Sequence, residues 1–436
     1  MLVNEVETKK YNMVDKKMEL FLNKELWSTA IQHLIDKGVR PAELSAYTTP
    51  EFRAMLVGVI ENGNYYVAPP HVSLIPKDNG EFRKVYVNTV LDRLVLSIIN
   101  SVCCDVYKDK IHPKCVSYQK GIGVRKIMQR ITEELSQKHS RGYKIDISKY
   151  FDSVDRKTLD ELLKQISSGS SLDKVIWDYY HDDLIMNENG EMETHYKSLA
   201  QGCAVAAFLA NMALRDVDEE MDKMCDIYYR YSDDILILGD HADEALEKLK
   251  KMLECKGLHI NPKKISPVTE NEWFTFLGMK IKGRQIGFSQ KSLKNIQDNM
   301  LSRIYCSKGC KKELKKSIKK VNSYLYSSYL KDSTSFGWGE YFFGTVNCEK
   351  DIILIDEWIK DVLRSEFTGK KKIGGLGCIN GKENTLQRGR GRNVKENLNK
   401  TKGLLEQCGY VSMHHLYKVY NIDRDVYRAE IARYMM

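Results

Sequence analysis

The chain has 436 residues, of which 42% are hydrophobic, and a formal charge of +9 with an isoelectric point near 8.8. No uninterrupted apolar run is long enough to span a bilayer, which excludes a membrane-spanning helix. The 11 cysteines are odd in number and scattered, which argues against a disulfide framework and suits a reducing compartment. Met1–Glu7 lacks the basic-then-apolar layout of a secretion signal, so we expect a cytoplasmic protein.

The first third of the chain predicts helices followed by a hairpin. Residues 15–65 alternate apolar and charged positions at helical spacing. Two strand-like runs, Val72–Lys77 and Phe82–Val87, flank Asp78-Asn79-Gly80, which is a typical hairpin turn. Residues 90–107 then have the pattern of an amphipathic or buried helix.

Residues 142–290 mix strands and helices, and Phe274–Ile281 has the pattern of a strand that ends in a turn. Residues 286–330 become helical and strongly basic, with lysines at positions 308, 311, 312, 315, 316, 319 and 320. Residues 369–403 are rich in Gly, Asn, Lys and Arg, and they contain ten basic residues but only two acidic ones. Residues 404–436 regain helical periodicity.

Three acidic residues carry the chemical argument. The run Tyr-Tyr-Arg-Tyr-Ser-Asp-Asp-Ile-Leu-Ile-Leu over residues 228–238 predicts two strands joined by a tight turn that holds Asp233 and Asp234. A third acid, Asp146, lies in the strand-like segment Lys144–Ile147 upstream. Three carboxylates on neighbouring strands suit two Mg²⁺ ions, which activate an attacking hydroxyl and stabilise the pyrophosphate leaving group in nucleotidyl transfer.

With these motifs in this order, the chain resembles prokaryotic reverse transcriptases of the group II intron lineage over roughly residues 65–365. The resemblance implies that Asp146, Asp233 and Asp234 are catalytic and that they bind two Mg²⁺ together with the carbonyl group of Ile147. It implies that Phe151 is the aromatic gate that excludes a 2′-hydroxyl group.

Further nucleotide contacts are implied by the same resemblance. Lys77 and Arg83 match basic residues that hold the triphosphate. Gln201 matches a residue beside the incoming nucleotide, and Gly202 allows close backbone approach. Lys264 matches a lysine that protonates the departing pyrophosphate, with Lys263 as a competing candidate. Intron enzymes usually carry Pro-Gln-Gly followed by Gly or Ser-Pro, whereas Cys203 and Ala204 follow here.

The implied fold is an α+β right-hand polymerase with fingers, palm and thumb. The boundaries that we expect are a helical lead-in over 1–68, fingers over 69–141, a palm of antiparallel sheet plus helices over 142–285, a helical thumb over 286–368, and a basic linker with a helical extension over 369–436. Phosphate contacts with RNA are expected from basic side chains of the thumb and linker: Lys311, Lys312, Lys315, Lys316, Arg388, Arg390 and Arg392.

Within this lineage, the chain looks most like the antiphage defence-associated reverse transcriptases of bacteria. No endonuclease motif follows the thumb, and the Asn-Ala-x-x-His element of retron enzymes is absent. We therefore expect deoxynucleoside triphosphates as substrates, complementary DNA as product, and an RNA template, in particular a structured non-coding RNA. The sequence does not indicate the primer or the oligomeric state.

Three alternatives stay open at this point. A group II intron-type reverse transcriptase or maturase shares the motifs. An RNA-dependent RNA polymerase would use Asp152 as an additional acid, although Phe151 and Tyr231 argue against it. A non-catalytic RNA-binding protein with a decayed site is disfavoured by the presence of all three acids, Gln201 and the basic residues of the fingers.

Overall fold

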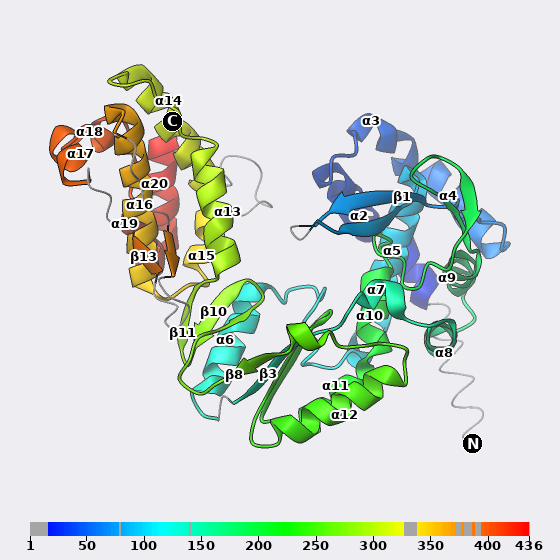
Figure 1. Ribbon diagram of the computed structural model, residues 1–436. Coiled ribbons are helices and arrows are strands. Elements are labelled where there is room, and N and C mark those ends of the chain that lie inside the picture. Colours follow the sequence, from blue (N-terminus) through cyan, green and yellow to red (C-terminus); the bar gives the residue numbers. More distant parts are fainter. Residues whose placement is uncertain are drawn as a thin grey trace. The chain divides into compact units, whose positions relative to one another are not determined.

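The computed structural model describes residues 16–77, 80–138, 141–326, 338–370, 376–378, 386–388 and 394–435, and it is a mixed α+β structure. The described residues fall into two compact units (Figure 1). The first unit contains the described residues up to Ile122 together with Gly142–Pro267, and the second contains Gly123–Arg141 and those from Val268 onward. None of the described helices has the length and apolar content that a bilayer crossing requires.

The first unit begins with helices, which confirms the helical pattern predicted over residues 15–65. They are α2 (Lys24–Asp36), α3 (Pro41–Leu44), the 3₁₀ helix η1 (Ser45–Thr48) and α4 (Pro50–Glu61). Helix α5 (Val90–Val106) matches the predicted helix over 90–107 and begins at Thr89, whose hydroxyl accepts a hydrogen bond from Asp92 N. Eight of its residues are buried, so α5 is the central helix of this part of the core.

The predicted hairpin is confirmed as β1 (His71–Pro76) paired antiparallel with β2 (Phe82–Val87). Its turn residues Asp78 and Asn79 lie outside the described part of the chain. Strands β4 (Leu184–Met186) and β5 (Met192–Thr194) extend the pair into a four-stranded sheet in the order β2-β1-β4-β5. The hairpin is thereby fixed to a segment about 100 residues away in sequence.

A second four-stranded sheet, in the order β6-β7-β3-β8, carries the acidic residues. Its strands are β3 (Gly142–Asp146), β6 (Ile227–Tyr231), β7 (Asp234–Leu238) and β8 (Ser266–Val268). Antiparallel pairing places Gly142 opposite Leu238 and Asp146 opposite Asp234. Residues 235–238 of β7 are fully buried, which follows from its central place in the sheet.

Helices cover this second sheet: α11 (Arg215–Met224) contacts β6, and α12 (Ala242–Glu254) contacts β3 and β7. Their amphipathic sequences bury one apolar face each; in α12 that face comprises Ala242, Ala245, Leu246, Leu249 and Leu253. The remaining helices of the unit are α7 (Tyr150–Ser153), α8 (Arg156–Ile166), α9 (Ser171–His181), α10 (Ala206–Ala213), η2 (Lys108–Lys110) and η3 (Pro262–Lys264).

The second unit combines α6 (Val124–Leu135) with a small sheet and a group of helices. The sheet has the order β11-β10-β9, with β9 (Phe274–Phe276), β10 (Met279–Lys282) and β11 (Gln285–Phe288). Two short strands, β12 (Leu376–Cys378) and β13 (Leu386–Arg388), pair with each other. The helices are α13 (Gln290–Leu301), α14 (Lys311–Tyr326), α15 (Trp338–Phe343), α16 (Glu349–Thr368), α17 (Val394–Lys400), α18 (Leu404–Gln407), α19 (Met413–Ile422) and α20 (Arg424–Met435).

Helices α17, α18 and α19 pack onto α16, and α20 packs onto α19 and α14 (Figure 1). The buried carboxylate of Asp356 accepts hydrogen bonds from Tyr410 OH, Ser412 OH and Met413 N, each at 2.8 Å. Lys360 Nζ lies 2.8 Å from the same carboxylate. These contacts make the start of α19 part of the core of the second unit, and the helical periodicity predicted over 404–436 is confirmed by α18, α19 and α20.

Two predicted elements differ from the structure. The apolar pattern of Phe274–Ile281 predicts one strand, but the segment is divided into β9 and β10 because Leu277 and Gly278 adopt left-handed backbone conformations with φ of 48° and 77°. The resemblance to reverse transcriptases implies a turn at Phe276-Leu277-Gly278, and this part of the prediction agrees with the structure. The start of the predicted helical region 286–330 is also wrong, because residues up to Phe288 belong to strand β11 and the first helix begins at Gln290. A tight turn of two residues leaves hydrophobic periodicity almost unchanged, which explains the first difference.

Candidate active site

The three predicted acids lie together at one end of the second sheet. Asp146 is the last residue of β3, and Asp234, the first residue of β7, is its direct partner across the two strands. Asp233 precedes β7 in the two-residue turn after β6, where Ser232 has a left-handed conformation with φ of 58°. The backbone N–H of Ile147 donates to the carbonyl of Asp233 at 3.0 Å, which ties the two acidic segments together.

The surroundings of Asp233 disfavour the negative charge of its carboxylate. Burial is the largest cause that raises the pKa of the Asp233 carboxyl group, and the charges of Asp146 and Asp234 raise it further. A backbone hydrogen bond and, to a smaller extent, Lys264 partly offset the increase. The negative charge of the cluster is therefore only partly compensated by the chain itself.

Two lysines lie on the acidic cluster. Lys264 Nζ is 2.5 Å from Asp146 Oδ1, and Lys144 Nζ is 3.1 Å from Asp234 Oδ1. The second contact is an ion pair without hydrogen-bond geometry, because Asp234 Oδ1 is buried and accepts no hydrogen bond. Of the two lysines that the sequence left open, Lys264 is therefore the one in contact with an acid. Lys144 was missed, although the two-residue period of β3 places it on the same face as Asp146.

The predicted gate residue follows closely on the first acid. Phe151 lies in α7, directly after Lys149 and Tyr150, and Lys149 has a left-handed φ of 48° that turns the chain away from β3. The half-buried ring of Phe151 packs against Tyr150 at a centroid distance of 5.6 Å, in an edge-on arrangement. Its carbonyl accepts a hydrogen bond from Leu199 N at 3.1 Å, which brings the segment before Gln201 beside α7.

Gln201 and the hairpin are joined through their backbones. The N–H of Tyr86 in β2 donates to the carbonyl of Gln201 at 2.7 Å. Gly202 has a φ of 109°, and a Cβ atom there would lie 2.5 Å from Val85 Cγ1 and 2.7 Å from the Tyr86 carbonyl oxygen. The close approach predicted for Gly202 is therefore made to strand β2 of the chain itself.

Lys77 and Arg83, the two basic residues predicted to bind the triphosphate, differ from each other in their surroundings. Lys77 directly follows β1, pairs with Glu81 at 3.4 Å, and is close enough to Asp152 to influence its ionisation. Arg83 is exposed, and strand alternation puts it on the face of β2 opposite to Lys84. Lys84, which sequence reasoning missed, lies 3.4 Å from His195 Nε2. Burial raises the pKa of the Asp152 carboxyl group, and Lys84, Lys149, Lys77 and His195 partly counteract the increase.

The basic residues predicted to contact RNA belong to the second unit. Lys311, Lys312, Lys315 and Lys316 are all exposed on α14, as are Lys319 and Lys320. The opposite face of α14 is buried through Leu314, Ile318, Val321 and Leu325. Arg388 lies in β13, where only the backbone is described, and Arg390 and Arg392 lie outside the described residues.

Residues 75–281 match a protein family described as reverse transcriptase (RNA-dependent DNA polymerase). This segment is a reverse transcriptase domain. Protein YkfC of Escherichia coli (strain K12) is 20% identical to the chain over 288 residues, which cover 56% of this chain and 74% of that protein. The reverse transcriptase domain contains all three acids and the predicted nucleotide-binding residues.

Solved telomerase structures are also similar. A truncated apo telomerase from Candida tropicalis matches with a TM-score of 0.40 and 14% identity, over 54% of this chain and 60% of that one. A telomerase from Candida albicans, in complex with a fragment of telomeric RNA, matches with a TM-score of 0.40 and 12% identity, over 89% of this chain and 71% of that one. The chain thus spans less than two thirds of the first of these telomerases.

The donor set of the reverse transcriptase domain fits the divalent metal ions that this family generally uses. Carboxylate oxygens are preferred ligands of Mg²⁺. The raised pKa of Asp233 indicates negative charge that a further cation would stabilise. Within the described ranges, no three His, Cys, Asp or Glu side chains already surround a common metal position. Lys144 and Lys264, which contact two of the acids, would have to move aside.

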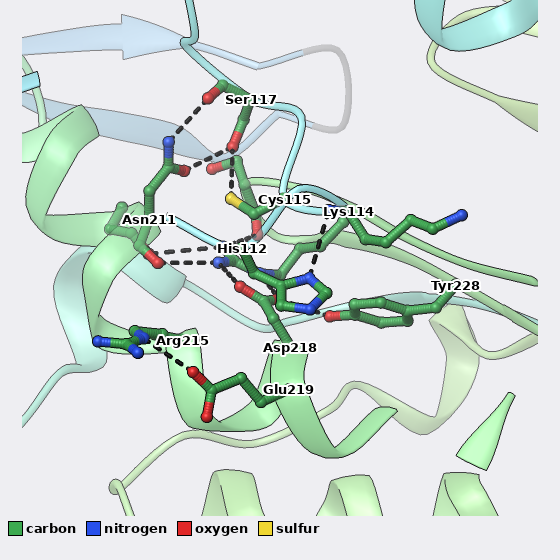
Figure 2. Close-up of polar contacts among 12 residues, drawn as sticks. His112, Lys114, Cys115, Ser117, Asn211, Arg215, Asp218, Glu219 and Tyr228 are labelled. Atoms are coloured by element: carbon green, nitrogen blue, oxygen red, sulfur yellow. Dashed lines mark hydrogen bonds and ion pairs between the residues drawn. The ribbon is translucent and has the colours of Figure 1, made fainter. Parts of the chain in front are cut away.

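A buried polar network beneath the acids was not predicted. Arg230 and Asp218 form an ion pair in which both side chains are fully buried. Figure 2 shows Asp218 beside Tyr228, and Ser117 facing Asn211, in the same network. The sequence offered one signal, an arginine within an otherwise apolar and aromatic strand, because a buried charge requires a partner.

We expect the substitution Gly202→Ala to destabilise the reverse transcriptase domain by about 2–4 kcal/mol, since it adds backbone strain to a steric clash with β2. Thermal or urea unfolding would measure the loss. Gly38→Ala is the matched control, because Gly38 has a similar φ of 91° but no atom within 4 Å of the added Cβ. Equal destabilisation by both substitutions would show that the contact with Val85 and Tyr86 costs nothing.

Proposed function

We propose that the protein extends a nucleic-acid 3′-hydroxyl group along an RNA template, using deoxynucleoside triphosphates and two Mg²⁺ ions. The observation that carries the proposal is the placement of Asp146 directly opposite Asp234, with Asp233 in the adjoining turn, inside a reverse transcriptase domain. When bound, the ions would activate the attacking hydroxyl group and stabilise the pyrophosphate leaving group.

In this proposal, the chain has the layout of a right-hand polymerase. Residues 69–141 are the fingers, 142–285 the palm and 286–368 the thumb, with 369–436 as a basic linker and extension. The carboxylates of Asp146, Asp233 and Asp234 and the carbonyl of Ile147 hold the ions. Lys264, through its contact with Asp146, is placed to deliver a proton to the leaving group.

The nucleotide would lie among residues that the reverse transcriptase domain contributes from several segments. Lys77 and Arg83 bind phosphate oxygens, Gln201 contacts the sugar or base, and Phe151 excludes the 2′-hydroxyl group. The backbone bond between Gln201 and Tyr86 supports this assignment, because it joins the loop of Gln201 to the strand that follows Lys77. The proximity of Phe151 to the segment before Gln201 supports it as well.

We further propose that the template is a structured non-coding RNA and that the enzyme acts in bacterial antiphage defence. Support comes from the sequence, where Gln201-Gly202 is followed by Cys203 and Ala204 as in a divergent member of the lineage. The exposed lysines of α14 support the contact with RNA.

Primer extension by the purified protein tests the polymerase activity. Incorporation of deoxynucleotides on a primed RNA template, dependent on Mg²⁺ and absent from an Asp233→Ala/Asp234→Ala variant, is the expected result. Sequencing of the nucleic acid that co-purifies from the host, with and without phage, tests the rest. If a recurrent RNA co-purifies but the wild-type protein yields no more complementary DNA than the Asp233→Ala/Asp234→Ala variant, the proposed reaction is overturned.

We expect the substitution of Lys311, Lys312, Lys315 and Lys316 by Gln to weaken RNA binding and to flatten its salt dependence. Each lost phosphate contact should lower the slope of log K against log salt by about 0.7 for single-stranded RNA. Filter binding or fluorescence anisotropy at several salt concentrations would measure this slope.

The control for charge alone is Lys248→Gln/Lys250→Gln on α12. These lysines pair with acids of the chain, Lys248 with Glu220 at 3.5 Å and Lys250 with Glu247 at 2.6 Å. Their replacement should leave the slope unchanged. An unchanged slope in the α14 variant would remove α14 from the RNA-binding surface.

A further inference from the structure

The buried pair of Arg230 and Asp218 is connected to the catalytic turn by a direct hydrogen bond. Arg230 Nε and Nη2 donate to the two carboxylate oxygens of Asp218, both at 2.6 Å. Arg230 Nη1 also donates to the carbonyl of Ser232 at 3.3 Å. Because Ser232 directly precedes Asp233, the guanidinium group reaches the backbone of the turn that presents this acid.

The same guanidinium group binds the end of α10. Its Nη2 donates to the carbonyl of Asn211 at 2.9 Å, and its Nη1 lies 3.5 Å from the carbonyl of Ala210. Both carbonyls belong to the last turn of α10, which ends at Ala213, and such carbonyls have no partner within the helix. A cation at this position is also favoured by the helix dipole.

The segment that follows Asp146 is bound to the same helix end. The Tyr150 hydroxyl group, four residues after Asp146, donates to the Ala210 carbonyl at 2.5 Å. Tyr150 is buried in the core, so its hydroxyl group is held by packing. The end of α10 is therefore a common support for the two chain segments that carry the acids.

The support is itself held from two sides. The Asn211 side chain accepts from the Ser117 hydroxyl group at 2.6 Å and donates to the Ser117 carbonyl at 2.7 Å (Figure 2). The Tyr228 hydroxyl group donates to Asp218 Oδ1 at 2.6 Å and fixes the carboxylate that orients Arg230. These bonds leave few alternative positions for the guanidinium group.

We propose that Arg230 and Tyr150 are positioning residues that set the separation of Asp146 and Asp233 by binding both acidic segments to the end of α10. The proposal rests on the proposed nucleotidyl transfer for its kinetic consequence, but it concerns the placement of the acids themselves. A buried ion pair that served stability alone would be replaceable by apolar side chains of similar volume.

The decisive variant is Arg230→Met/Asp218→Leu, which removes both charges together and leaves neither one buried alone. We expect it to remain folded and to lose kcat by about 10- to 100-fold, as for other residues that orient metal ligands. The KM for the nucleotide should change little. Affinity for Mn²⁺, measured by electron paramagnetic resonance without nucleic acid, should also fall, and this readout does not require polymerase activity.

Two further variants keep the test decisive. Tyr150→Phe removes one hydroxyl group and retains the ring, so it should fold and lower kcat several-fold even if the double variant fails to fold. Lys17→Met/Asp173→Asn is the matched control, because Lys17 and Asp173 form another buried ion pair of the same unit and this variant likewise removes both charges. It should lower the melting temperature while leaving kcat and Mn²⁺ affinity unchanged.

The outcomes separate this proposal from the proposed function. The positioning role would be overturned if the wild-type protein synthesises DNA and both Tyr150→Phe and a folded double variant keep its kcat and Mn²⁺ affinity. The polymerase assignment would then stay intact. Absence of synthesis by the wild-type protein would overturn the polymerase assignment. In that case, Mn²⁺ affinity alone would still decide whether Arg230 and Tyr150 place the acids.

Discussion

Asp233→Asn is expected to abolish DNA synthesis and, at the same time, to stabilise the protein in the absence of metal ions. Outer-shell partners of metal ligands are worth about 10- to 100-fold in activity, so loss of a direct ligand should cost more than about 100-fold in kcat. Primer extension on an RNA template and thermal unfolding in a chelator would measure the two effects.

The sign of the stability effect follows from the pKa of Asp233. Burial, together with Asp146 and Asp234, raises the pKa of this carboxyl group in the folded protein. The folded state therefore binds more protons than the unfolded state between the unfolded and the folded pKa, and stability falls as pH rises through that window. Above the folded pKa the full penalty is present, and the neutral amide of Asn removes it.

Asp226→Asn provides the comparison, because Asp226 is another acid of the first unit that lies outside the acidic cluster. It should not reproduce the combination of lost synthesis and increased stability. Retention of synthesis by Asp233→Asn would show that Asp233 is not a metal ligand. If Asp233→Asn melts at a lower temperature than the wild-type protein in the chelator, the charge of Asp233 is better compensated than its proximity to Asp146 and Asp234 indicates.

Phe151→Ala is expected to let the enzyme accept ribonucleotides. The ring of Phe151 packs against Tyr150 in α7, a few residues after Asp146, and its truncation removes the bulk that the proposed gate requires. A pocket contact of this kind changes discrimination by about 10- to 100-fold in kcat/KM. The ratio of kcat/KM for deoxyribonucleoside and ribonucleoside triphosphates with the same base would measure the change.

Phe151→Tyr retains the bulk of the ring and should retain the preference for deoxynucleotides. If Phe151→Ala leaves the ratio unchanged, Phe151 is a packing residue. If the wild-type enzyme already prefers ribonucleotides, the chain is an RNA polymerase, and the additional acid Asp152 regains importance.

The acidic cluster was predictable because its signals are local. A hairpin places Asp233 and Asp234 next to each other, and the apolar runs around Asp146 indicate a neighbouring strand. The exposed lysines of α14 follow from helical periodicity in the same way. The hairpin of β1 and β2 was predictable from its turn residues.

The supporting contacts were not predictable, because they join segments that are distant in sequence. Nothing in the spacing of Arg230, Asp218 and Ala210 indicates that a guanidinium group spans a helix end and a turn. Lys144 shares a face of β3 with Asp146 by strand periodicity, but its contact with Asp234 depends on the pairing of β3 with β7. The division of β9 from β10 depends on left-handed conformations at Leu277 and Gly278, which the apolar pattern does not reveal.

The alignment of β3 with β7 has a consequence for the kinds of sequence change that the protein tolerates. Gly142 lies opposite Leu238, and a Cβ atom there would be 2.2 Å from the carbonyl oxygen of Ile237. Insertion or deletion of one residue between Gly142 and Asp146 would shift the strand by about 3.3 Å and turn its side chains to the other face. Evolution of this enzyme must therefore keep the number of residues in β3, because a change would move Asp146 from its place opposite Asp234.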